Sequence, residues 1–169
     1  MALEPKDLYI VDEFREVVER VKTALELPVL NYQFGEDEHI IKAMRDMKKE
    51  KVTSYPLIAV VLPVDIQRGN SGGYYGKALI PRVVIATVTN QLSSPETRME
   101  QVIKPIIQPV YNRLLLEIKN QVKTFVIMGD IKHTERTRFG TQTAAQGFTE
   151  YLDGKELLNM EITLKQDFS

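Results

Sequence analysis

One serine of the sequence stands in a setting that could support nucleophilic chemistry, Ser71 within the glycine-rich stretch Gly69–Gly73. A nucleophilic serine needs a histidine to take its proton and a carboxylate to orient that histidine. The only upstream histidine is His39, and it lies in a segment with a helical pattern. We therefore predict a flexible loop here rather than a catalytic site.

The same stretch shares part of the pattern of a phosphate-binding loop, G-x-x-x-x-G-K-[ST]. When Gly76 and Lys77 are aligned with that pattern, Ser71 takes the place of the first glycine. Ala78 then replaces the hydroxyl residue that binds magnesium. We expect no nucleotide binding at this loop.

The densest group of cations lies between residues 132 and 138, where Lys132, His133, Arg136 and Arg138 accompany Glu135. Such a segment is either a solvated loop or a basic loop that faces a polyanion such as DNA through non-specific phosphate contacts. Both interpretations stay open. On the second one, the candidate contacts with DNA in a channel are Lys132, Arg136 and Arg138.

Composition excludes several kinds of site. The chain has 169 residues, and 22 Lys and Arg against 23 Asp and Glu give a formal charge of −1, without a general excess that would attract polyanions. It has no cysteine, which excludes disulfides and thiolate chemistry, and only two histidines. The carboxylates at 36–38 stand where a helix is expected to start. We predict no catalytic residue, no metal, no cofactor, no membrane span and no signal peptide.

Apolar residues at helical spacing predict three helices, at about 12–27, 36–49 and 94–120. Ser94 and Pro95 form a favourable start for the third helix. Pro105 and Pro109 lie inside it, so we expect either a kink near residue 104 or two abutting helices.

A short extended piece is predicted at 29–34 and strands at 55–62, 78–90, 125–128 and 158–164, with flexible loops near 67–77 and 129–150. The order of elements predicts one α+β domain over residues 1–169, in which a largely antiparallel or mixed sheet packs against helices. The strand 78–90 is apolar on both faces, with Ile80 and Val84 expected on the face opposite to Val83. The cover of the Val84 face comes either from the second helix layer of the same chain or from a neighbouring subunit.

Four stretches together resemble small neck proteins of tailed bacteriophages, of the tail-terminator or head-to-tail joining type. They are the strand 55–60, the strand 80–90 with its short polar link to a helix, the helix 103–115 and the closing strand 158–164. The resemblance covers most of the chain from the first helix onward. The loop 69–76 and the segment 129–150 are not part of it.

The resemblance implies a tail-terminator-like fold and a non-enzymatic virion structural protein at the head–tail junction, assembled in the host cytoplasm. It implies a homo-oligomeric ring, six-fold or twelve-fold, around the DNA channel, with adjacent portal, neck or tail proteins as partners. Tyr74, Tyr75 and Val84 are the candidate interface residues. The alternatives are a small cytosolic ligand-binding domain or enzyme that uses the loop 69–76 as a lid, and a cytosolic adaptor of the same fold.

Overall fold

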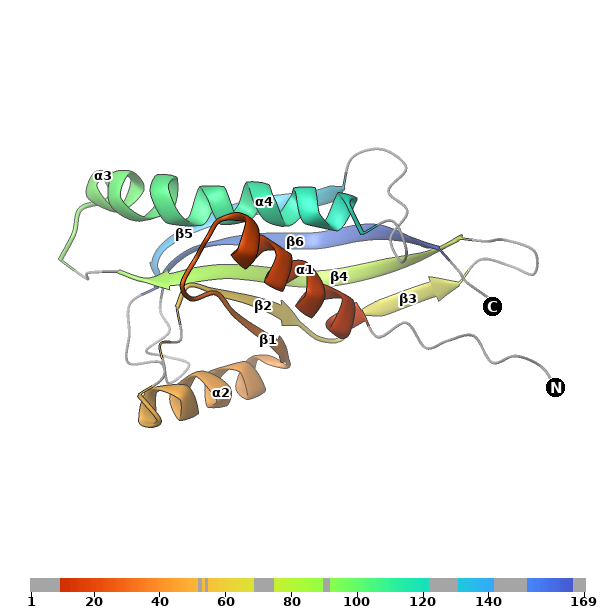
Figure 1. Cartoon of the computed structure of the whole chain (residues 1–169), viewed down its shortest axis with the longest axis horizontal. Coiled ribbons are helices and arrows are strands. Elements are labelled where there is room, and N and C mark those ends of the chain that lie inside the picture. Colours follow the sequence, from red (N-terminus) through yellow and green to blue (C-terminus); the bar gives the residue numbers. More distant parts are fainter. Residues whose placement is uncertain are drawn as a thin grey trace.

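The structure, a computed structural model, is built on a mixed sheet with helices on both faces (Figure 1). It describes residues 10–51, 53, 55–68, 75–89, 92–121, 131–141 and 152–165. The strands are β1 (Asn31–Gly35), β2 (Leu57–Val61), β3 (Asp65–Arg68), β4 (Tyr75–Val88), β5 (Lys132–Thr141) and β6 (Leu152–Lys165). Their order is β1-β2-β4-β6-β5, and β3 pairs with the start of β4. Only β1 and β2 are parallel, so the predicted α+β class with a mixed sheet is confirmed.

Two helical segments cover one face of the sheet and a third helix lies on the other face (Figure 1). The first face carries α1 (Ile10–Ala24) and a rod made of α3 (Pro95–Arg98), η1 (Met99–Ile107) and α4 (Gln108–Lys119). The second face carries α2 (Asp37–Lys49). The apolar stripe of α1 is buried in the main core, as its spacing predicts.

The helical rod contains Pro105 and Pro109 and remains continuous at both. Ser94 accepts a hydrogen bond from the Thr97 backbone N–H and caps α3. The turns around Pro105 are those of a π-helix, whose wider spacing suits a position with no N–H to donate. Pro109 stands near the start of α4. The expected kink or pair of abutting helices is therefore replaced by a change of helix type within one continuous rod (Figure 1).

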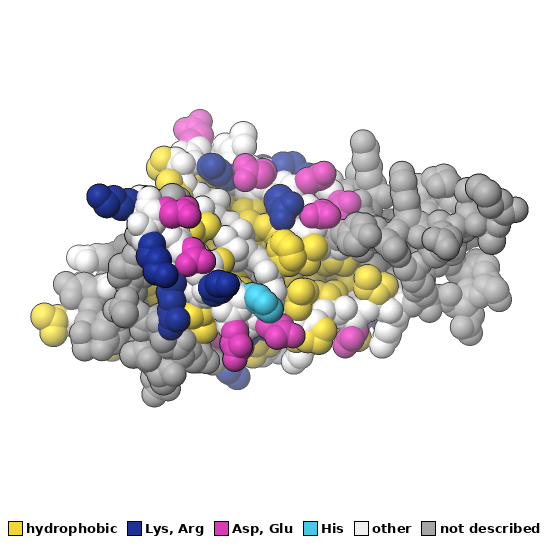
Figure 2. All heavy atoms as spheres, turned by 90° about the horizontal axis from the view of Figure 1, so that it is seen from below, with side chains coloured by type: hydrophobic (Ala, Val, Ile, Leu, Met, Phe, Trp, Pro, Cys, Tyr) yellow, Lys and Arg dark blue, Asp and Glu magenta, His cyan; other side chains and the backbone are white. Residues whose placement is uncertain are grey.

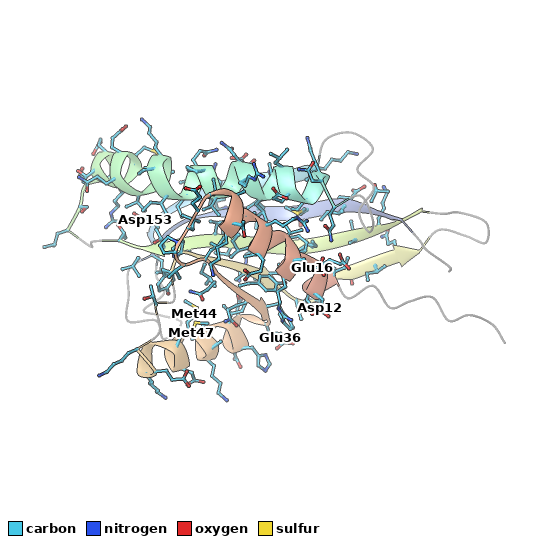
Figure 3. The ribbon with its side chains drawn as sticks, in the orientation of Figure 1. Asp12, Glu16, Glu36, Met44, Met47 and Asp153 are labelled. Atoms are coloured by element: carbon cyan, nitrogen blue, oxygen red, sulfur yellow. The ribbon has the colours of Figure 1, made fainter. Side chains whose placement is uncertain are left out.

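A second, smaller core lies between α2 and the sheet. Ile40 and Met44 of α2 pack there against Leu57 and Ala59 of β2, and Val84 of β4 packs against the same cluster. Figure 3 shows Met44 on the side of α2 that faces the sheet. Near Val84, the second cover of β4 is therefore the second helix layer of the same chain.

The long strands β4 and β6 change the face that they turn to the main core. The paired residues Ile80 and Met160 are both buried in that core, and so are the paired residues Val83 and Leu157. A spacing of three residues reverses the two-residue alternation of a strand. Asn159 has a positive φ of 54° within this interval of β6. The prediction that placed Ile80 opposite to Val83 was wrong, because it assumed an unbroken alternation.

The two flexible loops were predicted over too many residues, because parts of both form strands in the structure. Residues 132–141 form strand β5 rather than a loop, because they pair with β6 along an otherwise polar segment. Residues 67–68 belong to β3 and residues 75–77 to β4. The predicted strand 125–128 lies outside the described residues.

The pair formed by β3 and the start of β4 projects past the ends of α1, α2 and α4 (Figure 1). We call this pair the arm, residues 65–68 with 75–79. Its register sets Ile66 of β3 opposite Ala78 of β4. Ile66 is 40% exposed, which is high for a large aliphatic side chain.

Candidate functional site

The predicted DNA contacts Lys132 and Arg136 lie on the α2 side of the sheet. Arg136 is paired with Glu156 of β6, and Lys132 with Glu161 of the same strand. Paired residues of an antiparallel ladder turn their side chains to the same face. Among the described residues, this part of the face carries no helix, and both cations are exposed.

A row of alternating charges crosses this face from α2 to the edge strand β5. Asp37 at the start of α2 binds Arg82 of β4, whose Nη1 lies 3.8 Å from Glu156 Oε1. The other Glu156 oxygen, Oε2, lies 4.0 Å from Arg136 Nη1. The Glu156 side chain is buried, so the two guanidinium groups offset the cost of removing its charge from water. We call Asp37, Arg82, Glu156 and Arg136 the charge row.

A second group of charges lies further along the same face. Lys77 Nζ of β4 lies 2.7 Å from Glu161 Oε1 of β6. The hydrogen bond from Lys77 lowers the pKa of Glu161, and the nearby charge of Lys132 acts in the same direction. With the charge row, four cations (Lys77, Arg82, Lys132, Arg136) face three carboxylates (Asp37, Glu156, Glu161), a difference of 4 − 3 = +1.

Figure 2 looks at the side of the molecule that carries α2 and shows Lys and Arg side chains interspersed with Asp and Glu. The cations of the sequence cluster are therefore partly neutralised by neighbours that are distant in sequence. Such a surface attracts a polyanion weakly.

The opposite face of β5 carries a polar cluster under α4, which sequence reasoning missed. It consists of Gln108 and Tyr111 of α4, His133 and Glu135 of β5, and Lys155 of β6. We call these residues the α4–β5 cluster. Lys155 is only 5% exposed. Its Nζ donates to Gln108 Oε1 at 2.8 Å and to Glu135 Oε2 at 3.1 Å, and it lies 4.2 Å from the centre of the Tyr111 ring.

The pKa values in this cluster follow from its contacts. Burial raises the pKa of Tyr111 well above its ordinary value of 10, and the hydrogen bond to Glu135 raises it further. The same bond, with the ammonium of Lys155, lowers the pKa of Glu135 below 4.5. At neutral pH, the phenol is therefore neutral and the carboxylate is charged.

Further ion pairs, each with a buried carboxylate, join the helices to the sheet and to one another. Arg98 of α3 lies 3.5 Å from Asp153 of β6, and Figure 3 shows Asp153 beneath the helical rod. Arg20 of α1 donates from Nε to Glu117 Oε2 of α4 at 3.0 Å, and Arg113 also pairs with Glu117. These contacts fix the positions of the layers, and they leave the charges engaged in structural roles.

Strand β6 supplies three buried charged residues that the sequence pattern did not predict. Its stretch 153–156 places Asp153, Lys155 and Glu156 in a strand, and all three are buried. Between them, a Cβ on Gly154 would lie 2.4 Å from the carbonyl oxygen of Ile85, so the close approach of β4 requires glycine. Charged residues beside a glycine are typical of an exposed turn, so the local sequence gives no sign that these three side chains are buried.

The remaining predicted site residues are only partly described. Tyr74 lies outside the described residues. Tyr75 is paired through its backbone with Lys165, and Arg138 with Gly154; the side chains of Tyr75 and Arg138 are outside the described part. Val84 is half-buried against the core under α2, so it does not form a free surface.

An open hollow of about 590 Å³ lies at the base of the arm. Its described lining comes from α1, the end of β1, the start of α2, the segment between β2 and β3, and Ile66 of β3. The lining is mostly apolar, with Glu36 and His39 among its polar residues. Residues 69–74 of the glycine loop lie outside the described residues. This hollow is where the alternative hypothesis of a ligand-binding domain would place a ligand.

Within the described residues, no group of three or more His, Asp and Glu side chains could hold a metal ion. No described helix is long and apolar enough to cross a membrane. The fold and these surfaces together define an α+β protein whose described charges are largely paired with one another. No family model matches the chain, and no curated protein or solved structure does so either.

Proposed function

We propose that this chain is a non-enzymatic virion structural protein that forms a ring at the phage head–tail junction, as a tail terminator or neck protein around the DNA channel. The arm is the observation that carries the proposal. It projects past the three helices and carries the exposed Ile66, so a neighbouring copy that covers it would remove apolar surface from water. A repeated contact between unlike surfaces closes into a ring when its rotation allows.

The edge strand β5 supports the second half of the proposal. Its exposed cations Lys132 and Arg136 lie on a face whose described charges are close to balance. Weak, non-specific attraction suits a surface past which DNA must move, because strong phosphate binding would hold the DNA in place. In the ring, this face of β5 lines the channel.

Sedimentation velocity of the purified chain at micromolar concentration tests the assembly. The wild-type chain should sediment as a defined multiple of 19.4 kDa. Ile66→Asp should sediment as a monomer and keep cooperative unfolding, because a charge at a covered apolar contact loses its hydration. Leu116→Asp is the matched control, since Leu116 is 44% exposed on α4, and this variant should assemble like the wild type.

Two results would contradict the proposal. One is a wild-type chain that stays monomeric throughout this concentration range. The other is an Ile66→Asp variant that assembles as well as Leu116→Asp. A monomer that binds a small molecule, and loses that binding on Ile66→Asp, would instead favour a ligand-binding domain that uses the hollow at the base of the arm.

A further inference from the structure

The hydroxyl of Tyr111 lies between two groups of strand β5 that compete for it. It is hydrogen-bonded to Glu135 Oε1, and it lies 2.9 Å from His133 Nε2. The other ring nitrogen, His133 Nδ1, lies 3.0 Å from the carbonyl oxygen of Ile131. A carbonyl oxygen can only accept, so Nδ1 carries a proton.

The available protons allow two arrangements. A phenol has one proton to donate. If Tyr111 donates it to Glu135, the contact with His133 Nε2 requires a proton on Nε2, and the imidazole is then a cation protonated at both nitrogens. If Nε2 has no proton, Tyr111 donates to it instead, and two acceptors, the phenol oxygen and the carboxylate, face each other.

The charged and polar groups around His133 come from three elements. Glu135 of β5 lies 3.9 Å from His133 Nε2 and favours the cation. Lys155 of β6 reaches the same carboxylate and the Tyr111 ring, and its charge opposes the cation. Helix α4 contributes the neutral Tyr111 and Gln108. The His133 side chain is 9% exposed, so water competes little for these contacts.

We propose that Tyr111, His133 and Glu135 form a proton-dependent latch between α4 and the edge strand β5. In the closed state, His133 is an imidazolium and Tyr111 donates to Glu135, so α4 holds β5 at two points. When Nε2 releases its proton to solvent, the hydroxyl turns to His133, and Glu135 keeps only Lys155 as a described donor. The latch does not depend on ring assembly.

Nuclear magnetic resonance of protein with labelled histidine tests the proton count, because the chain has only His39 and His133. In the closed state, both ring nitrogens of His133 should carry protons. On deprotonation, the remaining proton should stay on Nδ1. In Glu135→Gln, the share of His133 that carries protons on both nitrogens at a given pH should fall, because the carboxylate that favours the cation is gone. The exposed His39 serves as the internal reference.

Hydrogen exchange of β5 amides tests the latch itself, with β2 amides as the reference. After correction for the intrinsic rate, exchange in β5 should rise roughly 2- to 12-fold as His133 deprotonates, the range for the removal of one hydrogen bond. His133→Gln should abolish this step, while His39→Gln should keep it. A neutral His133 with its proton on Nε2, an unchanged titration in Glu135→Gln, or a step that survives His133→Gln would each overturn the proposal.

Discussion

Lys155 of β6 and Glu135 of β5 meet under helix α4, with Nζ and Oε2 3.1 Å apart. The two ends of the pair have different surroundings, because the lysine side chain is 7% exposed and the glutamate side chain 44%. Loss of the carboxylate therefore leaves a buried ammonium with only Gln108 as a described acceptor. Loss of the lysine leaves a carboxylate that water can still reach.

This asymmetry predicts the outcome of a double substitution. Glu135→Gln should lower the free energy of unfolding by about 2 kcal/mol, because it takes a charged partner from a buried cation. Adding Lys155→Met to that variant should restore part of the loss, since an apolar chain of similar length needs no partner. Urea unfolding measures both values. A double variant less stable than Glu135→Gln alone would contradict the prediction.

A second prediction concerns alkaline pH. Burial raises the pKa of Tyr32, whose hydroxyl donates to the Val11 carbonyl oxygen at 2.8 Å, and burial with the bond to Glu135 raises that of Tyr111. A raised pKa in the fold means that stability is fully present below the unfolded value of about 10 and is lost as the pH rises above it. Each ionising group contributes a slope of up to about 1.4 kcal/mol per pH unit.

Urea unfolding between pH 9 and 11, with tyrosinate absorbance recorded in parallel, measures this slope. The slope should be shallower in Tyr32→Phe and in Tyr111→Phe than in the wild type, although each variant also loses a hydrogen bond at every pH. Equal slopes in all three proteins would show that these two phenols ionise in the fold as they do in the unfolded chain.

The position of Val84 gives a third prediction. Because Val84 packs against the core under α2, Val84→Asp places a carboxylate against apolar side chains and should lower the Tm by about 5–10 °C. Val88→Asp is the matched control on the same strand, since Val88 is 46% exposed, and its Tm should stay within about 2 °C of wild type. A Val84→Asp variant with the wild-type Tm and a loss of assembly would assign this face to a subunit contact instead.

The sequence predicts those elements whose pattern is local. The buried stripe of α1 follows from helical spacing, and strand β2 follows from an uninterrupted apolar run, because each pattern lies within one short segment. The reversal at Asn159 and the burial of Lys155 do not, because they depend on contacts between distant strands and helices. Lys132 and Arg136 could be grouped from the sequence because they are close along the chain. The contact of Arg136 with Glu156 could not be predicted, since it joins two strands.

The cations of β5 give a fourth prediction. Replacing Lys132, Arg136 and Arg138 with Gln should weaken binding to duplex DNA and lower the slope of log affinity against log salt by about 0.9 for each phosphate that is no longer neutralised. The matched control replaces Lys22, Lys104 and Lys119, cations of the helix layer on the other face, and should keep the wild-type slope. Fluorescence anisotropy between about 50 and 200 mM salt provides the measurement, in the range where such interactions dominate. Equal slopes for the two variants would mean that β5 does not face DNA.

Electron microscopy of the purified wild-type chain tests the proposed ring most directly. We predict closed rings of a single size with an open centre wide enough for duplex DNA, and separate small particles for Ile66→Asp under the same conditions. A field of uniform monomers, or open filaments without closure, would contradict the proposal of a ring around the DNA channel.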